Sequence, residues 1–164
     1  MNDLPKRHHP RLTEYDYGQN GCYFLTLCTK GRKQSLSRIC VGRGPLTPPE
    51  VCLSPIGQVV EKYILRIDSV YPGVTVDNYV IMPNHVHLLL TICNDNGGGV
   101  RTPRPTDIPT VVRGLKSMVT REVGSPIWQT SYYDHVVRNE PDHLRIWDYI
   151  DTNPAKWQED EYYE

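Results

Sequence analysis

Two β-rich runs separated by only two residues constrain the fold of this chain most strongly. Residues 75–82 (TVDNYVIM) and 85–92 (HVHLLLTI) are dominated by residues that favour strands, and Pro83 and Asn84 join them. So short a connection predicts a hairpin or a tightly bent pair of strands.

Flanking segments supply further elements in a definite order. Ser54 and Pro55 are typical of a helix start, and Gly124 of a helix end. Residues 41–53 contain too many glycines and prolines for a long element. The expected elements are a strand at 22–29, a helix from Ser54 to Ile67, the strands 75–82 and 85–92, a helix ending at Val123, a short strand within 127–138 and a helix from Pro141 to Pro154.

This order, β-α-β-β-α-β-α, predicts an α+β fold. It is that of a ferredoxin-like, split βαβ antiparallel sheet with helices on one face and an added C-terminal helix. At 164 residues, the chain is expected to form a single domain over 1–164. Within it we expect a basic arm at 1–20, a Gly/Pro-rich mobile loop at 94–109 and an acidic tail at 158–164.

Helical periodicity assigns faces to the last two helices. In the helix ending at Val123, Arg113, Lys116, Ser117 and Thr120 share a polar face. Its expected buried stripe is Val111, Val112, Leu115, Met118 and Val119. The expected stripe of the last helix is Leu144, Ile146, Trp147 and Ile150. Arg145, Tyr149 and Asn153 form an i, i+4, i+8 row away from that stripe.

Composition narrows the class of protein. No apolar run approaches twenty residues, so no membrane span or membrane partner is expected, and the start lacks a secretory apolar region. Five cysteines without CxxC spacing argue against a disulfide framework and a cysteine zinc site, and favour a reduced cytoplasm. The net charge is −1, but four acids lie in 158–164, which leaves 18 basic against 15 acidic residues elsewhere. The body of the protein is therefore mildly basic.

The strand 85–92 carries two candidate metal ligands. Alternation places His85 and His87 on one face of the strand and Val86, Leu88 and Leu90 on the other. Two imidazoles side by side can chelate one metal ion, although two ordinary histidines on a partly wet sheet face explain the pattern equally well. The row on the last helix offers a phenol, Tyr149, and an amide, Asn153, that face the same point.

Four motifs, in chain order, resemble a known family. They are GCYFLTLCT at 21–29, YVIMPNHVHLLL at 79–90, Trp128-Gln129 followed by YYDH at 132–135, and Asp148-Tyr149-Ile150 leading to Asn153-Pro154. Together they resemble the REP-associated tyrosine transposases, which belong to the single-tyrosine, HUH-type transposases that act on single-stranded DNA. The resemblance spans nearly the whole chain.

The resemblance implies both an activity and a set of site residues. The activity is nicking and rejoining of single-stranded DNA, at hairpin-forming repeats, through a covalent 5′-phosphotyrosine. Tyr149 corresponds to the catalytic tyrosine, and His85 and His87 to ligands of a divalent metal, Mg²⁺ or Mn²⁺. Asn153 corresponds to the third ligand, where insertion-sequence relatives have glutamine. A bacterial cytoplasm with association to the nucleoid is the location implied.

The expected DNA contacts are six basic residues on two segments. Arg113, Lys116 and Arg121 lie on the helix that ends at Val123, and Lys6, Arg7 and Arg11 lie in the arm. His135 is expected to be structural. Aromatic residues after the last helix, including Trp157 and Tyr162, must pack on their own domain, pack on a neighbour or stay free. The resemblance implies either a monomer or a dimer with shared active sites, and we expect a homodimer in which Tyr149 of one chain meets the histidines of another.

Two other functions compete with the transposase hypothesis. One is a catalytically silent DNA-hairpin binding protein that regulates rather than cleaves. The other is a metal phosphohydrolase, which is disfavoured because no cluster of Asp or Glu accompanies the histidines.

Overall fold

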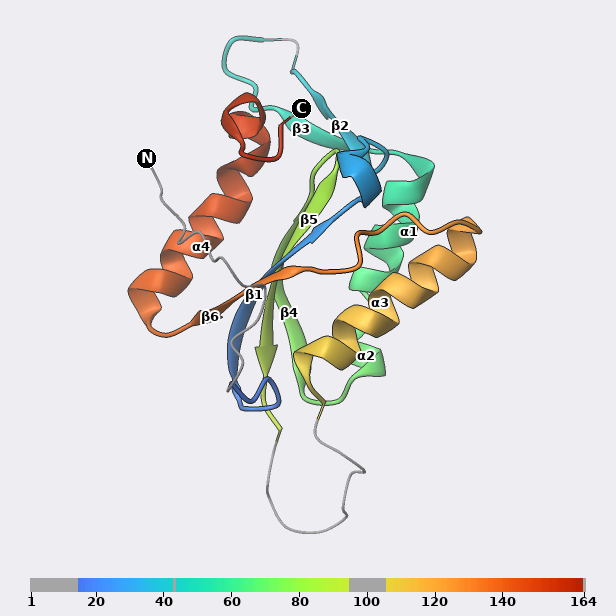
Figure 1. Cartoon of the computed structure of the whole chain (residues 1–164). Coiled ribbons are helices and arrows are strands. Elements are labelled where there is room, and N and C mark those ends of the chain that lie inside the picture. The colour runs from blue at the N-terminus through green and yellow to red at the C-terminus, as the bar shows by residue number, and fades with distance from the viewer. Residues whose placement is uncertain (1–14, 43, 95–105, 164) are drawn as a thin grey trace.

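The computed structural model describes residues 15–42, 44–94 and 106–163, and its centre is a four-stranded antiparallel sheet (Figure 1). The strands are β1 (Gly21–Cys28), β2 (Ser37–Cys40), β3 (Glu50–Leu53), β4 (Val74–Ile81), β5 (His85–Ile92) and β6 (Tyr133–Val137). The sheet order is β4-β5-β1-β6, with every neighbouring pair antiparallel. The predicted ferredoxin-like fold class is therefore confirmed.

Three helices cover one face of this sheet (Figure 1): α1 (Pro55–Ile64), α2 (Ile67–Val70) and α3 (Ile108–Val123). Alternate residues of the central strands, such as Leu25 and Leu88, are buried in the core that these helices share with the sheet. The helix that we expected to reach Ile67 breaks after Ile64 and resumes as the short α2.

The helix ends follow the sequence signals. The Ser54 hydroxyl accepts the N–H of Gly57 at 3.0 Å, and the Asp107 carboxylate accepts that of Thr110 at 2.8 Å. Gly124 adopts a left-handed conformation, with φ of 79°, and ends α3.

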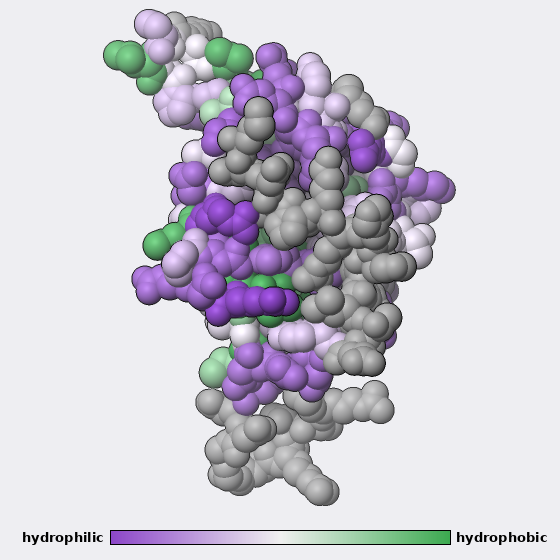
Figure 2. All heavy atoms as spheres, turned by 60° about the vertical axis from the view of Figure 1, so that its left-hand side comes forward, coloured by the Kyte–Doolittle hydropathy of each residue, from purple (hydrophilic) through white to green (hydrophobic). Residues whose placement is uncertain are grey.

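The opposite face of the sheet is covered by α4 (Glu140–Thr152) and the 3-10 segment η2 (Asn153–Glu159). Phe24 and Leu89 of the sheet pack against Ile146 and Ile150 of α4 in a second core. The outer surface formed here by the described residues is largely hydrophilic (Figure 2). One sheet thus separates two cores, and the face toward α4 is the one that carries His85 and His87.

The predicted faces of α3 and α4 need correction. Met118 is 41% exposed, Leu144 60% and Trp147 38%, so none of them belongs to a buried stripe. On α4 the buried residues are Ile146 and Ile150, four apart, so the stripe is narrower than the sequence suggested. The Tyr149 row, expected to face away from the core, is instead partly buried against the sheet.

Residues 37–53 form a small hairpin that the sequence analysis did not predict. Ser37 pairs with Leu53 and Cys40 with Glu50 in a two-stranded sheet of β2 and β3. This register makes Cys40 and Cys52 diagonal neighbours, with Cα atoms 6.1 Å apart, and a disulfide joins them. The sequence argued against a disulfide framework and did not predict this single bridge, because the pairing depends on a hairpin within a segment rich in glycine and proline.

β6 is shorter than the range 127–138, and Trp128 forms only an isolated bridge with Thr29. The 3-10 segment η1 (Lys30–Arg32) follows β1. Among the described residues, no helix has the length and apolar character needed to cross a membrane. The arm residues Lys6, Arg7 and Arg11, and positions 95–105 of the Gly/Pro-rich loop, lie outside the described residues.

Candidate metal and tyrosine site

His85 and His87 lie side by side at the start of β5, beneath α4 and the C-terminal segment, which comprises residues 153–163. Their Nε2 atoms are 3.0 Å apart, and both side chains are buried. Nδ1 of His85 contacts Asn84 Oδ1 at 2.8 Å, and Nδ1 of His87 contacts the Thr26 hydroxyl at 2.9 Å. Each ring is therefore held through Nδ1, while the two Nε2 atoms contact each other and face the position that a shared metal ion would take.

Burial keeps both imidazoles neutral. It lowers the pKa of His87 to about 3, and it lowers the pKa of His85 well below the usual 6.5, with His87 adding to the effect. Neutral imidazole is the form that coordinates a metal ion. The pair is thus in the protonation state of a metal ligand at neutral pH.

Tyr149 of α4 faces this pair. Its ring centroid lies 5.2 Å from that of His87 and 6.0 Å from that of Phe24. Burial and the negative charge of Asp160 raise the pKa of Tyr149, whereas a hydrogen bond with Asn153 acts to lower it. The phenol is consequently protonated at neutral pH.

Asn153 follows α4 and lies one turn beyond Tyr149. Its side chain lies beside those of Tyr149 and Asp160 and acts to lower the pKa of both groups. Its Oδ1 is buried and has no hydrogen-bond partner among the described residues. An unpaired buried acceptor is costly, and a metal ion is one of the partners that satisfies it. Oδ1 therefore fits the role of a metal ligand.

Asp160 is the site residue that sequence reasoning missed. Its Oδ2 lies 4.0 Å from His85 Nε2, and its carboxylate is 2% exposed. The ligand atoms of His85, His87 and Asp160 all lie within 4.8 Å of one another. We expected no cluster of Asp or Glu beside the histidines, and the single carboxylate of Asp160 was not foreseen, because Asp160 comes from the segment interpreted as a solvated acidic tail. The aromatic residues Trp157 and Tyr162, on either side of Asp160, were the signal in the sequence that this segment packs against the protein.

The C-terminal segment packs directly on the histidines. The ring of Tyr162 lies over that of His85, with centroids 4.5 Å apart, and Trp157 lies 5.9 Å from the same ring. The Asn84 amide donates to the Tyr162 carbonyl at 2.7 Å. The packing of Trp157 and Tyr162 on their own domain accounts for the complete burial of His85.

Together these residues fit a divalent cation. Two neutral imidazoles, an unpaired amide oxygen and a buried carboxylate are donors that Mn²⁺ and Mg²⁺ accept. Donors bound to one octahedral ion at about 2.1 Å lie about 3 to 4 Å apart. The separations of 3.0 Å and 4.0 Å are of that size.

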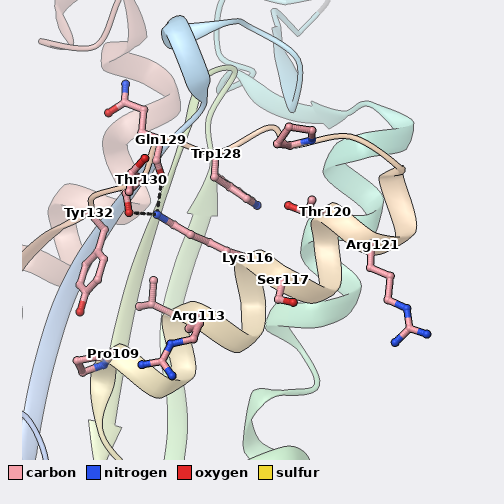
Figure 3. A pocket seen from close by; sticks show the side chains of 12 residues that line it. Pro109, Arg113, Lys116, Ser117, Thr120, Arg121, Trp128, Gln129, Thr130 and Tyr132 are labelled. Carbon is pink, nitrogen blue, oxygen red and sulfur yellow. Dashed lines mark hydrogen bonds between the residues drawn. The ribbon is translucent and has the colours of Figure 1, made fainter.

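A second candidate site lies on α3, which packs on the other face of the sheet. The pocket has a volume of about 650 Å³ between α3 and residues 126–132 (Figure 3). Arg113 and Arg121 line it and are exposed. Lys116 also lines it, but its ammonium donates to the carbonyls of Gln129 at 2.7 Å and Ser131 at 3.0 Å. Lys116 therefore holds this segment in place.

His135 has a structural contact, as expected. Its Nε2 lies 2.7 Å from a carboxylate oxygen of Asp142, whose other oxygen accepts from Arg145. These contacts tie β6 to the first turns of α4 and lie apart from the His85 and His87 pair.

Comparison with known proteins places these features in context. No family model matches the chain. An uncharacterized protein of Haemophilus influenzae is 31% identical, over 93% of this chain and 91% of its own. The REP-associated tyrosine transposase of Escherichia coli is 24% identical, over 88% of this chain and 74% of its own.

A solved structure shares the fold. It is that of a REP-associated tyrosine transposase bound to a REP hairpin, with a TM-score of 0.63, 23% identity and coverage of 89% of this chain and 74% of that one. The sheet and helices described here thus form a transposase fold. In both sequence and fold, the chain is therefore similar to the REP-associated tyrosine transposases.

Proposed function

We propose that this protein nicks and rejoins single-stranded DNA at hairpin-forming repeats, through a covalent 5′-phosphotyrosine on Tyr149. The observation that carries the proposal is the meeting of Tyr149, Asn153 and the histidine pair in one buried polar cluster. These residues come from β5 and from the end of α4, so the fold, rather than local sequence, brings them together.

The chemistry uses the Tyr149 hydroxyl as nucleophile. Its oxygen forms a bond to the phosphorus of the scissile phosphate, and the bond from phosphorus to the 3′ oxygen breaks, releasing a 3′ hydroxyl. Because its pKa is raised, the phenol is protonated at neutral pH, so it must give up its proton as it attacks, while the departing 3′ oxygen takes up a proton. A 3′ hydroxyl of another strand reverses the reaction and frees Tyr149, so rejoining needs no external energy source.

His85, His87 and Asn153 are the residues proposed to hold Mg²⁺ or Mn²⁺. When bound, the ion supplies positive charge that stabilises the charge developing on the scissile phosphate. Asn84 and Thr26 orient the two imidazoles through Nδ1. Asn153 also contacts Tyr149, which links the proposed ligand set to the nucleophile.

The proposed DNA contacts are Arg113, Lys116 and Arg121 on α3, with the arm residues Lys6, Arg7 and Arg11. The pocket beside α3 presents two exposed guanidinium groups, which suit phosphate oxygens (Figure 3). The named structural relative binds a REP hairpin, and this supports hairpin DNA as the partner here.

Retention of the whole cluster favours an active enzyme over a silent hairpin-binding protein. A homodimer stays a prediction, although one chain already brings Tyr149 and His87 together. The test is incubation with single-stranded hairpin DNA and Mn²⁺, followed by denaturing electrophoresis. We expect an oligonucleotide linked to the protein, and none in EDTA. DNA binding without any adduct would support the silent regulator instead.

A further inference from the structure

We infer that Asp160 is an additional ligand of the divalent metal, so that the site combines two imidazoles from β5 with a carboxylate from the C-terminal segment. The inference rests on the proposed function, since it concerns the same ion. It adds a residue that neither the sequence motifs nor the proposed ligand set contains.

Geometry favours this role over that of a surface acid. Oδ2 of Asp160 faces His85 Nε2 at 4.0 Å, and the carboxylate is almost completely buried. A buried carboxylate is costly unless it is paired or coordinates a metal ion. Its two acidic neighbours in sequence, Glu159 and Glu161, are exposed, so only Asp160 is directed into the site.

The carboxylate is fixed before any ion binds. Oδ1 accepts the backbone N–H of Tyr162 at 2.7 Å, which leaves Oδ2 to face the histidines. Tyr162 is in turn held by Asn84, which orients His85. A continuous series of hydrogen bonds, through Tyr162 and Asn84, therefore connects the position of Asp160 to that of the His85 ring.

The competing explanation is that Asp160 only stabilises the turn at Tyr162. Asp160→Asn separates the two roles, because the amide oxygen still accepts the Tyr162 N–H whereas the negative charge is lost. Glu161→Gln is the matched control, since it removes the same charge from an exposed neighbour. His87→Gln serves as the reference for loss of a proposed imidazole ligand.

The experiment is calorimetric titration of the full chain with Mn²⁺, without DNA, together with the electron paramagnetic resonance spectrum of bound Mn²⁺. We expect Asp160→Asn to weaken Mn²⁺ binding at least tenfold, and Glu161→Gln to change it less than twofold. Equal affinity of Asp160→Asn and the unmodified chain, with His87→Gln weakened, would overturn the inference alone. Equal affinity in all four proteins would overturn the proposed metal site as well. Unfolding curves without Mn²⁺ check that each variant is folded.

Discussion

Oδ1 of Asn84 accepts a hydrogen bond from Nδ1 of His85 over 2.8 Å, while the amide of the same Asn84 donates to the Tyr162 carbonyl. Because donor and acceptor of the amide are both used, its orientation is fixed, and it fixes the His85 tautomer with Nε2 unprotonated. Asn84, which is not among the proposed ligands, thus determines which nitrogen of His85 is unprotonated.

This relationship predicts the effect of Asn84→Ala on metal affinity. Loss of the acceptor frees the His85 ring, so Mn²⁺ binding should weaken about 10- to 100-fold. Asn84→Asp keeps the acceptor and should retain more affinity than alanine does. Calorimetry measures both variants, and a similar loss in the two would show that the bond to Tyr162 matters instead.

Substitution of Tyr149 by phenylalanine should remove the covalent adduct while leaving hairpin affinity nearly unchanged. Only the attacking oxygen is lost, and the ring that contacts His87 and Phe24 is kept. Denaturing electrophoresis detects the adduct, and fluorescence anisotropy measures binding. Tyr133→Phe is the control, because this tyrosine is exposed on β6. An adduct that survives in Tyr149→Phe would reject Tyr149 as nucleophile.

The buried histidines predict that stability without metal falls on acidification. The pKa of His87 is about 3 in the folded chain and near 6.5 when unfolded, so unfolding takes up a proton below pH 6.5. Stability is therefore full above pH 6.5 and is lost progressively toward pH 3. Between pH 6.5 and 5 the loss from His87 is about 2 kcal/mol.

Denaturant unfolding in EDTA across this range measures the effect, with His87→Gln as reference. Because the variant keeps every other titrating group, including Asp160, only the difference in slope reports on His87. Parallel stability profiles for the two proteins would contradict the buried neutral state. His87→Gln is preferable to alanine, because His87 is fully buried and truncation would leave a cavity.

Substitution of the two arginines that line the α3 pocket should weaken DNA binding in a salt-dependent way. Arg113→Gln and Arg121→Gln should each weaken hairpin binding and reduce the slope of log affinity against log salt by about 1. Lys116→Gln should in addition lower stability, since its ammonium holds the carbonyls of Gln129 and Ser131. If neither arginine variant changed the slope of log affinity against log salt, the DNA phosphates would have to contact another part of the protein.

Mixing two inactive variants tests whether each chain contains its own site. Tyr149 and His87 lie 5.2 Å apart, centroid to centroid, within one chain. We therefore expect a mixture of Tyr149→Phe and His87→Gln proteins to form no adduct. Recovery of the adduct in the mixture would show that active sites are shared between chains, as the homodimer hypothesis proposes.

Local patterns were sufficient to predict the frame of this site. Alternation placed His85 and His87 on one face of β5, and helical spacing aligned Tyr149 with Asn153. The contributions of Asp160 and Asn84 could not be predicted in this way, because they depend on how the C-terminal segment folds back over the sheet. Leu144 and Trp147 misled the assignment, since a helix that covers a polar cluster need not bury its most apolar side.

The position of β5 between two cores also bears on how the chain folds. A slip of one residue in its pairing would turn both imidazoles toward the apolar core of Val86 and Leu88, away from Thr26 and Asn84. Two imidazoles without partners there would cost several kcal/mol, so the misaligned strand is strongly disfavoured. The histidine pair thus favours the native register of β5 over a shifted one, even without a bound ion or DNA.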